Sequence, residues 1–168
     1  MDVKIIPSLL NGTIEIPSSK SASHRMLICA GLCNGISELS GITMSKDIKA
    51  TIEALISMGA DIRHDNDKIY VKGISNSVDS CTIDCCESGS TLRFIIPIAA
   101  ALGIKTVFLG EGKLPERPIT PYLREFNNKG IKFTYENTMP FSIEGKLLAG
   151  EYILEGDISS QFITGLLF

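Results

Sequence analysis

The chain has 168 residues, of which 44% are hydrophobic and 21% charged, and its formal net charge is −3. This composition is typical of a folded chain of one domain, or of one domain and part of another, and it excludes a disordered polar tail. A slightly acidic chain has no general attraction for nucleic acid, so we expect no nucleic-acid partner. The chain has no apolar run of membrane-spanning length and no secretion signal at its start, so we expect no membrane association and a cytoplasmic location.

The five cysteines indicate a reducing compartment. They are an odd number in a chain without a secretion signal, which favours free thiols over disulfides. Neither histidine stands at a spacing typical of a zinc finger, so we expect no metal site. The thiols are therefore interpreted as buried or inert.

In chain order, the first predicted helix opens on a polar turn that recurs further along. Ser19–Arg25 and Glu87–Arg93 align, and each precedes an apolar stretch long enough for a helix, at Met26–Leu32 and Phe94–Leu102. Small polar residues just before such stretches are typical helix N-caps. The two segments therefore predict two equivalent helices with similar starts.

A second predicted helix follows in each copy of this repeat. The segments Gly41–Gly59 and Gly112–Gly130 have the same length from glycine to glycine, and three apolar positions in each coincide: Ile48 with Ile119, Ile52 with Leu123, and Leu55 with Phe126. Spacings of three and four place these residues on one helical face, and each closing glycine stands where a helix commonly ends.

A β-hairpin is predicted after each second helix. In the first copy, apolar and polar residues alternate within residues 60–63 and again within 68–72. In the second copy, residues 131–135 and 141–144 form the same kind of pair. Each unit is thus expected to run strand, polar turn, helix, strand, helix, strand, strand. Residues 151–168 resemble the start of a third unit, with a strand at Tyr152–Glu155 and a helix after Ser159. Because the chain stops within this apolar helix, we expect it to be truncated, with the remainder of a third repeat missing.

The helix starts carry groups that suit an anion. Lys20, Ser21, Ser23 and Arg25 cluster at the first, where free N–H groups and the helix dipole also favour negative charge. The second offers Gly89 and Arg93, and the loop at 110–118 adds Lys113 and Arg117; residues 159–161 form a fourth such turn. Each signal alone also fits an ordinary serine cap with solvated cations, or a tight turn with a structural ion pair.

Four motifs in this order resemble the 5-enolpyruvylshikimate-3-phosphate synthase family. They are Ile16–Arg25, the Gly89 turn ending at Arg93, Pro115–Ile119 and Ser159–Phe162. The resemblance covers the whole chain but under half of a complete member. It implies an inside-out α/β fold of six βαβαββ units in two domains, of which about two and a fraction are present here.

The resemblance also implies domain boundaries. Residues 1–17, with strands at about Val3–Ile6 and Thr13–Ile16, would pack with the second domain, whose main body is absent. Residues 18–168 would form an incomplete first domain, with units at about 18–84, 85–150 and 151–168. A complete member would be a monomer.

The implied reaction transfers the enolpyruvyl group of phosphoenolpyruvate to the 5-hydroxyl of shikimate 3-phosphate and releases phosphate, a step of the shikimate pathway toward chorismate and aromatic amino acids. No metal or organic cofactor is implied. Lys20 would contact both substrates and is the one catalytic position carried by this part of the chain. The residues expected to bind shikimate 3-phosphate are Lys20, Ser21, Arg25, Ser159, Ser160 and Gln161, and those expected to bind phosphoenolpyruvate are Lys20, Gly89, Arg117 and Gln161.

One position departs from the family pattern, because Glu87 stands where some members carry asparagine. The groups that move protons in the family come from the second domain, so we expect this chain to bind substrate weakly and to be inactive alone. One alternative is the related UDP-N-acetylglucosamine enolpyruvyl transferase, which carries Lys-Asn at the first motif and a cysteine in the later loop; here the motif is Lys20-Ser21 and residues 110–118 contain no cysteine. A second alternative is a non-catalytic, repeat-built binding module.

Overall fold

The computed structural model describes residues 3–9 and 11–168 and confirms the mixed α/β class. The elements of the first repeat are α1 (Lys20–Leu32), β1 (Ile36–Ser40), α2 (Lys46–Ser57), β2 (Asp61–Asp65) and β3 (Lys68–Lys72). Those of the second are β4 (Ser80–Asp84), α3 (Gly89–Leu102), β5 (Lys105–Leu109), α4 (Thr120–Asn128), β6 (Lys132–Thr134) and β7 (Phe141–Glu144). The third segment contributes α5 (Ser160–Leu167).

The two sheets show the repeat directly. The first has the order β1-β3-β2, with antiparallel pairs throughout. The second has the order β4-β5-β7-β6, in which β5-β7-β6 repeats the first sheet and β4 adds a parallel strand at the edge. Both predicted hairpins, β2 with β3 and β6 with β7, are confirmed.

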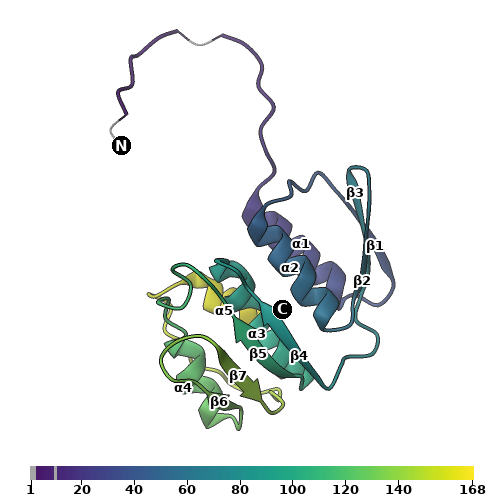
Figure 1. The fold of residues 1–168 in the computed structure, drawn as a ribbon, viewed down its shortest axis with the longest axis vertical. Helices are drawn as coiled ribbons and strands as arrows, with labels where there is room; N and C mark the ends of the chain where they lie inside the picture. The colour runs from purple at the N-terminus through teal and green to yellow at the C-terminus, as the bar shows by residue number, and fades with distance from the viewer. Residues whose placement is uncertain (1–2, 10) are drawn as a thin grey trace.

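The helices pack on the sheets in the same way in both repeats. In the first, α1 contacts β1 and β3 while α2 contacts β2; in the second, α3 contacts β5 and β7 while α4 contacts β6. The two repeats meet where α2 packs on β4 and α3 and where α1 reaches α3 (Figure 1). These contacts place α1 and α2 of the first repeat against α3 of the second.

Local chemistry explains the helix bounds. Ser19 and Ser88 accept hydrogen bonds from the backbone N–H groups three residues later, which confirms both predicted N-caps. Gly59 and Gly130 follow the ends of α2 and α4 with φ of +111° and +85°. Such backbone angles favour glycine, because a side chain there meets the backbone.

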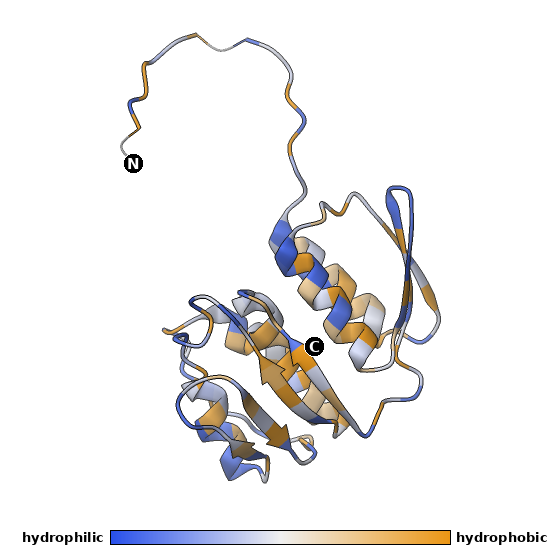
Figure 2. Cartoon of the chain, in the orientation of Figure 1, coloured by the Kyte–Doolittle hydropathy of each residue, from blue (hydrophilic) through white to orange (hydrophobic). Residues whose placement is uncertain are grey.

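Apolar side chains from both repeats form a continuous core between helices and sheets. Strands of the second sheet carry much of the hydrophobic colour in Figure 2. The predicted face of α2 is buried, and so are Ile119 and Phe126 around α4. Leu123, expected on the same face, is only half-buried, while its neighbour Tyr122 is fully buried. The large aromatic ring stacks on Phe126 and takes the inner position.

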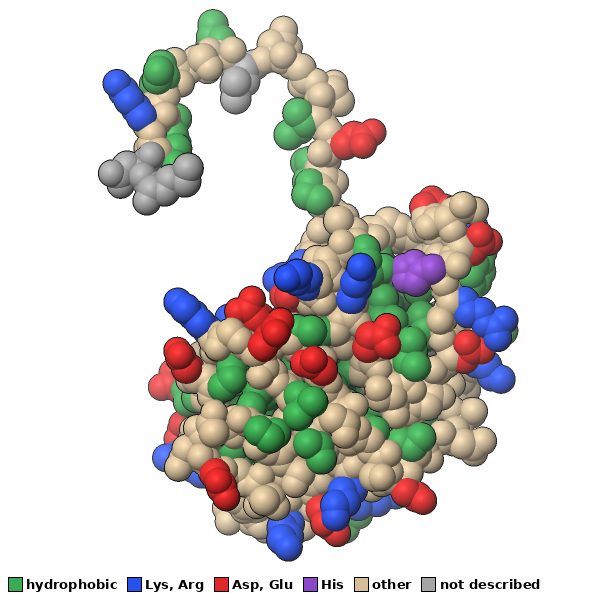
Figure 3. Space-filling model, viewed as in Figure 1, with side chains coloured by type: hydrophobic (Ala, Val, Ile, Leu, Met, Phe, Trp, Pro, Cys, Tyr) green, Lys and Arg blue, Asp and Glu red, His purple; other side chains and the backbone are tan. Residues whose placement is uncertain are grey.

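One predicted strand is wrong, because residues 152–155 have no strand structure. Residues 3–6 and 13–16, whose expected partner is the second domain, have no strand structure in this chain alone, and Ile5 and Ile14 are more than four-fifths exposed. Their pairing with that domain stays a prediction. A strand needs a neighbour to satisfy its N–H and C=O groups, and no strand among the described residues pairs with these segments. The N-terminal arm, residues 3–9 and 11–17, carries apolar side chains that lie away from the folded body (Figure 3). The predicted segment 1–17 also includes Met1, Asp2 and Leu10, which lie outside the described residues.

All five cysteines are free, as predicted, but they are not all buried. Cys85 is buried, Cys81 and Cys86 are half-buried, and Cys29 and Cys33 are exposed. Cys29 and Cys33 line an open groove between α1 and β1. There β1 is the edge strand of the first sheet, whereas its counterpart β5 in the second sheet is covered by the extra strand β4. Within residues 3–9 and 11–168, no helix combines the length and apolar character needed to cross a membrane.

Candidate functional site

The start of α1 presents the first group of predicted binding residues. Lys20 and Ser21 are exposed in its first turn, and Arg25 is half-buried one turn later. The first N–H groups of a helix have no partner within the helix, so this end carries partial positive charge. The structure thus brings these three predicted residues together at a surface that favours an anion.

Lys20 is held by a carboxylate across the helix pair. Its Nζ lies 2.7 Å from Asp47 Oδ2 at the start of α2, and both side chains retain solvent contact. Exposed ion pairs of this kind contribute at most about 1 kcal/mol to stability. An anion that approaches Lys20 would therefore compete with a weakly held partner.

Ser21 and Arg25 are bonded to each other. Arg25 Nη1 donates to the backbone oxygen of Ser21 at 2.9 Å and also contacts its hydroxyl. Ser23, which the sequence grouped with them, is buried and donates to the carbonyl of Ser19, so it faces the helix and not a ligand. The α1 site therefore comprises Lys20, Ser21 and Arg25 without Ser23.

The start of α3 forms a second group, with Arg117 beside Gly89. A methyl group on Gly89 would lie 2.6 Å from Arg117 Nη1, so the absence of a side chain leaves room for the guanidinium. Arg117 is exposed in the loop after β5, which buried Leu114 anchors. Both predicted phosphoenolpyruvate residues of this region are thus in contact.

The start of α5 joins this second group through Gln161. Its Oε1 accepts from Arg93 Nη1 at 2.8 Å, and its Nε2 donates to Ser90 Oγ at 2.7 Å. Ser159 caps the helix by accepting from the N–H of Gln161, and Ser160 is exposed beside it. Helices α3 and α5 therefore present their starts side by side.

The close approach of α5 to α3 depends on a small residue and a buried phenol. A methyl group on Gly165 would lie 2.4 Å from both the carbonyl oxygen of Arg93 and the hydroxyl of Tyr122. That hydroxyl lies 2.9 Å from the Arg93 carbonyl and 2.7 Å from the Phe162 carbonyl, so one phenol ties α4 to both helices. These contacts hold Gln161 against Ser90 and Arg93.

Positive charge collects at this group. Burial lowers the pKa of Arg93, and the nearby charge of Arg117 lowers it further. Neither guanidinium forms an ion pair with a carboxylate among the described residues. Arg93 instead lies 5.0 Å from the ring centroid of Phe162, a cation–π contact. Two arginines without a carboxylate partner suit a bound anion.

The α1 group and the α3–α5 group are neighbours. Arg25 lies 5.4 Å from the ring centroid of Phe94 on α3, and α1 contacts α3 directly. The described polar side chains at these helix starts are hydroxyls, an amide, a lysine and arginines. Such groups suit the binding of anions.

Sequence reasoning missed two members of the cluster and misjudged one. Ser90, which lies within the recognised turn, was not selected, although its hydroxyl contacts Gln161. Asp47, the partner of Lys20, had no signal in the sequence beyond its place at a helix start. Arg93 was given an ion pair as its ordinary alternative, but its partner is the amide of Gln161.

Glu87 contacts the loop that carries Arg117. A methyl group on Gly112 would lie only 1.8 Å from Glu87 Oε1, so the carboxylate sits directly against the backbone of that glycine. The backbone N–H of Glu111 also donates to the carbonyl of Cys86 at 2.8 Å. The residue that departs from the family pattern therefore packs against the loop and stays outside the Gln161 contacts.

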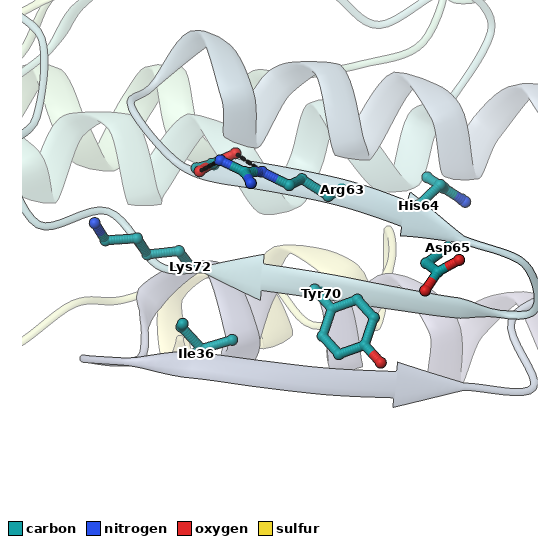
Figure 4. A pocket seen from close by; sticks show the side chains of 7 residues that line it. Ile36, Arg63, His64, Asp65, Tyr70 and Lys72 are labelled. Carbon is teal, nitrogen blue, oxygen red and sulfur yellow. Dashed lines mark hydrogen bonds and ion pairs between the residues drawn. The ribbon is translucent and has the colours of Figure 1, made fainter.

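A separate open hollow lies on the outer face of the first sheet (Figure 4). Its lining residues are Ile36, Asp61, Arg63, His64, Asp65, Tyr70 and Lys72. It contains none of the predicted site residues, and Arg63 is already paired with Asp61 at 2.9 Å. The convergence of cations and hydroxyls at the helix starts is therefore the stronger candidate site.

Fold and site together define a repeat-built α/β protein whose cations and hydroxyls gather at its helix starts. Residues 5–168 match the family model of EPSP synthase (3-phosphoshikimate 1-carboxyvinyltransferase). The chain belongs to this family.

Curated relatives are similar in sequence to nearly the whole chain. It is 48% identical to the 3-phosphoshikimate 1-carboxyvinyltransferase of Clostridium kluyveri and 49% identical to that of Clostridium beijerinckii, each match covering 99% of this chain. It spans only 39% and 40% of the lengths of these relatives. A solved structure of EPSP synthase from Acinetobacter baumannii matches 93% of this chain and 37% of that protein with a TM-score of 0.73 and 24% identity, which confirms the fold.

Proposed function

We propose that this chain supplies substrate-binding groups for transfer of the enolpyruvyl group from phosphoenolpyruvate to the 5-hydroxyl of shikimate 3-phosphate, with release of phosphate. Family membership supports the reaction class. The observation that carries the proposal is the contact of Gln161 with Ser90 and Arg93, because it joins two predicted substrate-binding turns that are far apart in the sequence. The α1 group lies beside them.

The proposed assignments divide the site between the two substrates. Ser21 and Arg25 hold the shikimate moiety, chiefly its carboxylate, with Lys20 beside them, and Ser159 and Ser160 hold the 3-phosphate. Guanidinium and hydroxyl donors at a helix start provide charge-assisted hydrogen bonds to such groups. Binding requires Ser21 and Arg25 to exchange their mutual contact for contacts with the ligand.

Phosphoenolpyruvate is assigned to the α3 group. Gly89 lines the site and leaves room for Arg117 beside the helix start, and Arg117 pairs with the anionic groups of the ligand. Gln161 and Lys20 are assigned to both substrates. Arg93 adds a second guanidinium to this region and supports Gln161.

Charge explains why such a cluster assists the reaction. Both substrates carry several negative charges, so bringing them together requires cations that offset their repulsion. Holding the hydroxyl near the vinyl carbon supplies part of the remaining acceleration. Loss of general acid–base assistance alone costs roughly 100- to 10,000-fold in rate, so we propose that the isolated chain binds substrate weakly without turnover.

Calorimetric titration with a panel of ligands tests this function. We expect saturable heat with shikimate 3-phosphate, weaker heat with shikimate because the phosphate contacts of Ser159 and Ser160 are lost, and none with UDP-N-acetylglucosamine. Saturation by the nucleotide sugar alone would favour the related transferase. Absence of heat with every ligand would favour a non-catalytic binding module. A phosphate-release assay with both substrates should show no turnover by this chain.

A further inference from the structure

A file of buried polar side chains connects α1, α2 and α3 beneath their starts. His24 Nδ1 lies 2.7 Å from Thr51 Oγ1, which lies 2.7 Å from Thr91 Oγ1. Thr91 Oγ1 in turn donates to Ser88 Oγ at 2.8 Å. All four side chains are fully buried. Buried polar groups are costly unless they are bonded, so this file is stable only when the three helices hold their positions.

The hydrogen bonds have one consistent direction. A hydroxyl has one proton to donate, and that of Thr91 is directed to Ser88 Oγ at 2.8 Å, with the Asp47 carbonyl as a second, longer acceptor at 3.4 Å. With either acceptor, Thr91 accepts from Thr51, and Thr51 accepts from His24 Nδ1. The proton of the imidazole is then on Nδ1, and the buried Nε2, which has no partner among the described residues, is a bare acceptor. An orphaned acceptor is less costly than an orphaned N–H.

The imidazole in this file is neutral. Burial lowers the pKa of His24 to about 4, and the nearby charges of Lys20 and Arg25 act in the same direction, against the opposing effect of Asp47. A charged imidazole would need to donate from both nitrogens, which the unpartnered Nε2 does not allow. Neutral His24 is therefore suited to a fixed donor role.

The file lies one turn below the groups assigned to the substrates. At one end, Ser88 is the N-cap of α3 and directly precedes Gly89. At the other, His24 follows Lys20 and Ser21 by one turn of α1. In the middle, Thr51 follows Asp47, the partner of Lys20, by one turn of α2.

We propose that His24, Thr51 and Thr91 are positioning residues that fix the start of α1 relative to the start of α3. This inference rests on the proposed function. Shikimate 3-phosphate would be held by α1 and by α5, and α5 is bonded to α3 through Gln161, so its binding spans the contact that the file secures. A preorganised contact lowers the cost of ordering both sides when the ligand binds.

Three threonine variants separate positioning from packing. Thr51→Val keeps the side-chain shape and removes the hydroxyl, whereas Thr51→Ser keeps the hydroxyl and removes a methyl group. Thr106→Val is the matched control, because Thr106 is equally buried but donates to the carbonyl of Ile104 in another part of the fold, at 3.0 Å. Each variant is titrated with shikimate 3-phosphate by NMR and unfolded with denaturant.

We expect Thr51→Val and Thr106→Val to lose comparable stability, but only Thr51→Val to bind shikimate 3-phosphate more weakly, by about tenfold. Thr51→Ser should stay within about twofold of the wild type, because it retains the hydrogen-bond file. Folded Thr51→Val with wild-type affinity would overturn the proposal. Equal weakening in Thr106→Val would do the same, because it would indicate a general effect of lost stability.

A ligand-free measurement keeps the positioning inference separate from the proposed function. The imidazole ¹⁵N spectrum of the wild type should show His24 protonated on Nδ1 and bare on Nε2, and Thr51→Val should shift the amide resonances of both Ser21 and Ser90. A proton on His24 Nε2, or unchanged Ser21 and Ser90 resonances in Thr51→Val, would overturn the proposed positioning role, whether or not the ligand binds. Failure of the wild type to bind shikimate 3-phosphate, with these spectra as expected, would overturn only the proposed function.

Discussion

Arg117 Nη1 occupies the space next to Gly89 so closely that a methyl group on the glycine would lie 2.6 Å away. Gly89→Ala should therefore displace the guanidinium and weaken phosphoenolpyruvate binding by about tenfold, the order of one charge-assisted hydrogen bond. Stability should change little, because the displaced atom ends a flexible side chain. Gly150→Ala is the control, since a methyl group there meets open space. Unchanged phosphoenolpyruvate affinity in Gly89→Ala would contradict this role of Arg117.

The Lys20–Asp47 pair predicts a gain of affinity on removal of the carboxylate. Asp47→Asn frees Lys20 Nζ, now 2.7 Å from the acid, and removes a negative charge from the α1 group. Shikimate 3-phosphate should bind about threefold more tightly, and the gain should shrink as salt screens the charges. Asp61→Asn, which breaks the exposed pair with Arg63, is the control. Weaker binding in Asp47→Asn would mean that the acid orients Lys20 and does not compete for it.

The hydroxyl of Tyr122 should matter more to α5 than its ring. Burial raises the pKa of Tyr122, so the group stays a donor to the carbonyls of Arg93 and Phe162. Tyr122→Phe leaves those carbonyls without this donor and should cost about 1–3 kcal/mol in the free energy of unfolding. Hydrogen exchange should accelerate in α5. Tyr135→Phe serves as the control. Equal hydrogen-exchange rates of the α5 amides in the two variants would show that the Tyr122 hydroxyl does not hold α5 in place.

The pH dependence of stability should carry the signature of His24. Its pKa is lowered from 6.5 to about 4 on folding, so only the unfolded chain binds a proton between these values. The contribution of His24 is fully present above pH 6.5 and is lost as the pH falls toward 4, by about 3 kcal/mol. His24→Gln should flatten this slope, whereas His64→Gln, which changes an exposed side chain, should not. If the stability of His24→Gln depended on pH as steeply as that of the wild type, the loss of stability at low pH would arise from another group.

Local patterns predicted the helices and hairpins well, because their determinants are close in sequence. Ser19 and Ser88 cap helices through bonds to residues three positions away, and Gly59 supplies the angle needed where a helix ends. Strands were predicted less well. Residues 152–155 were expected to be a strand from their place in the repeat but have no paired neighbour, and pairing is a property of the whole sheet.

The site was predicted as a set of turns but not as a set of contacts. Motif resemblance selected Gly89, Arg117 and Gln161, which the structure brings to neighbouring helix starts. The partners that join them, Ser90 and Arg93, depend on how α5 packs on α3 across about seventy residues of sequence. No local periodicity encodes such a contact.

Residue-resolved NMR titration with shikimate 3-phosphate tests the central claim, that the starts of α1 and α5 together hold this ligand. We predict saturable shifts at millimolar ligand in the amides of Ser21 and Arg25 and, with the same apparent affinity, in those of Ser160 and Gln161. Shikimate without the phosphate should move the first pair but not the second. Shifts confined to the outer face of the first sheet, or no saturable shift at either helix start, would contradict the account.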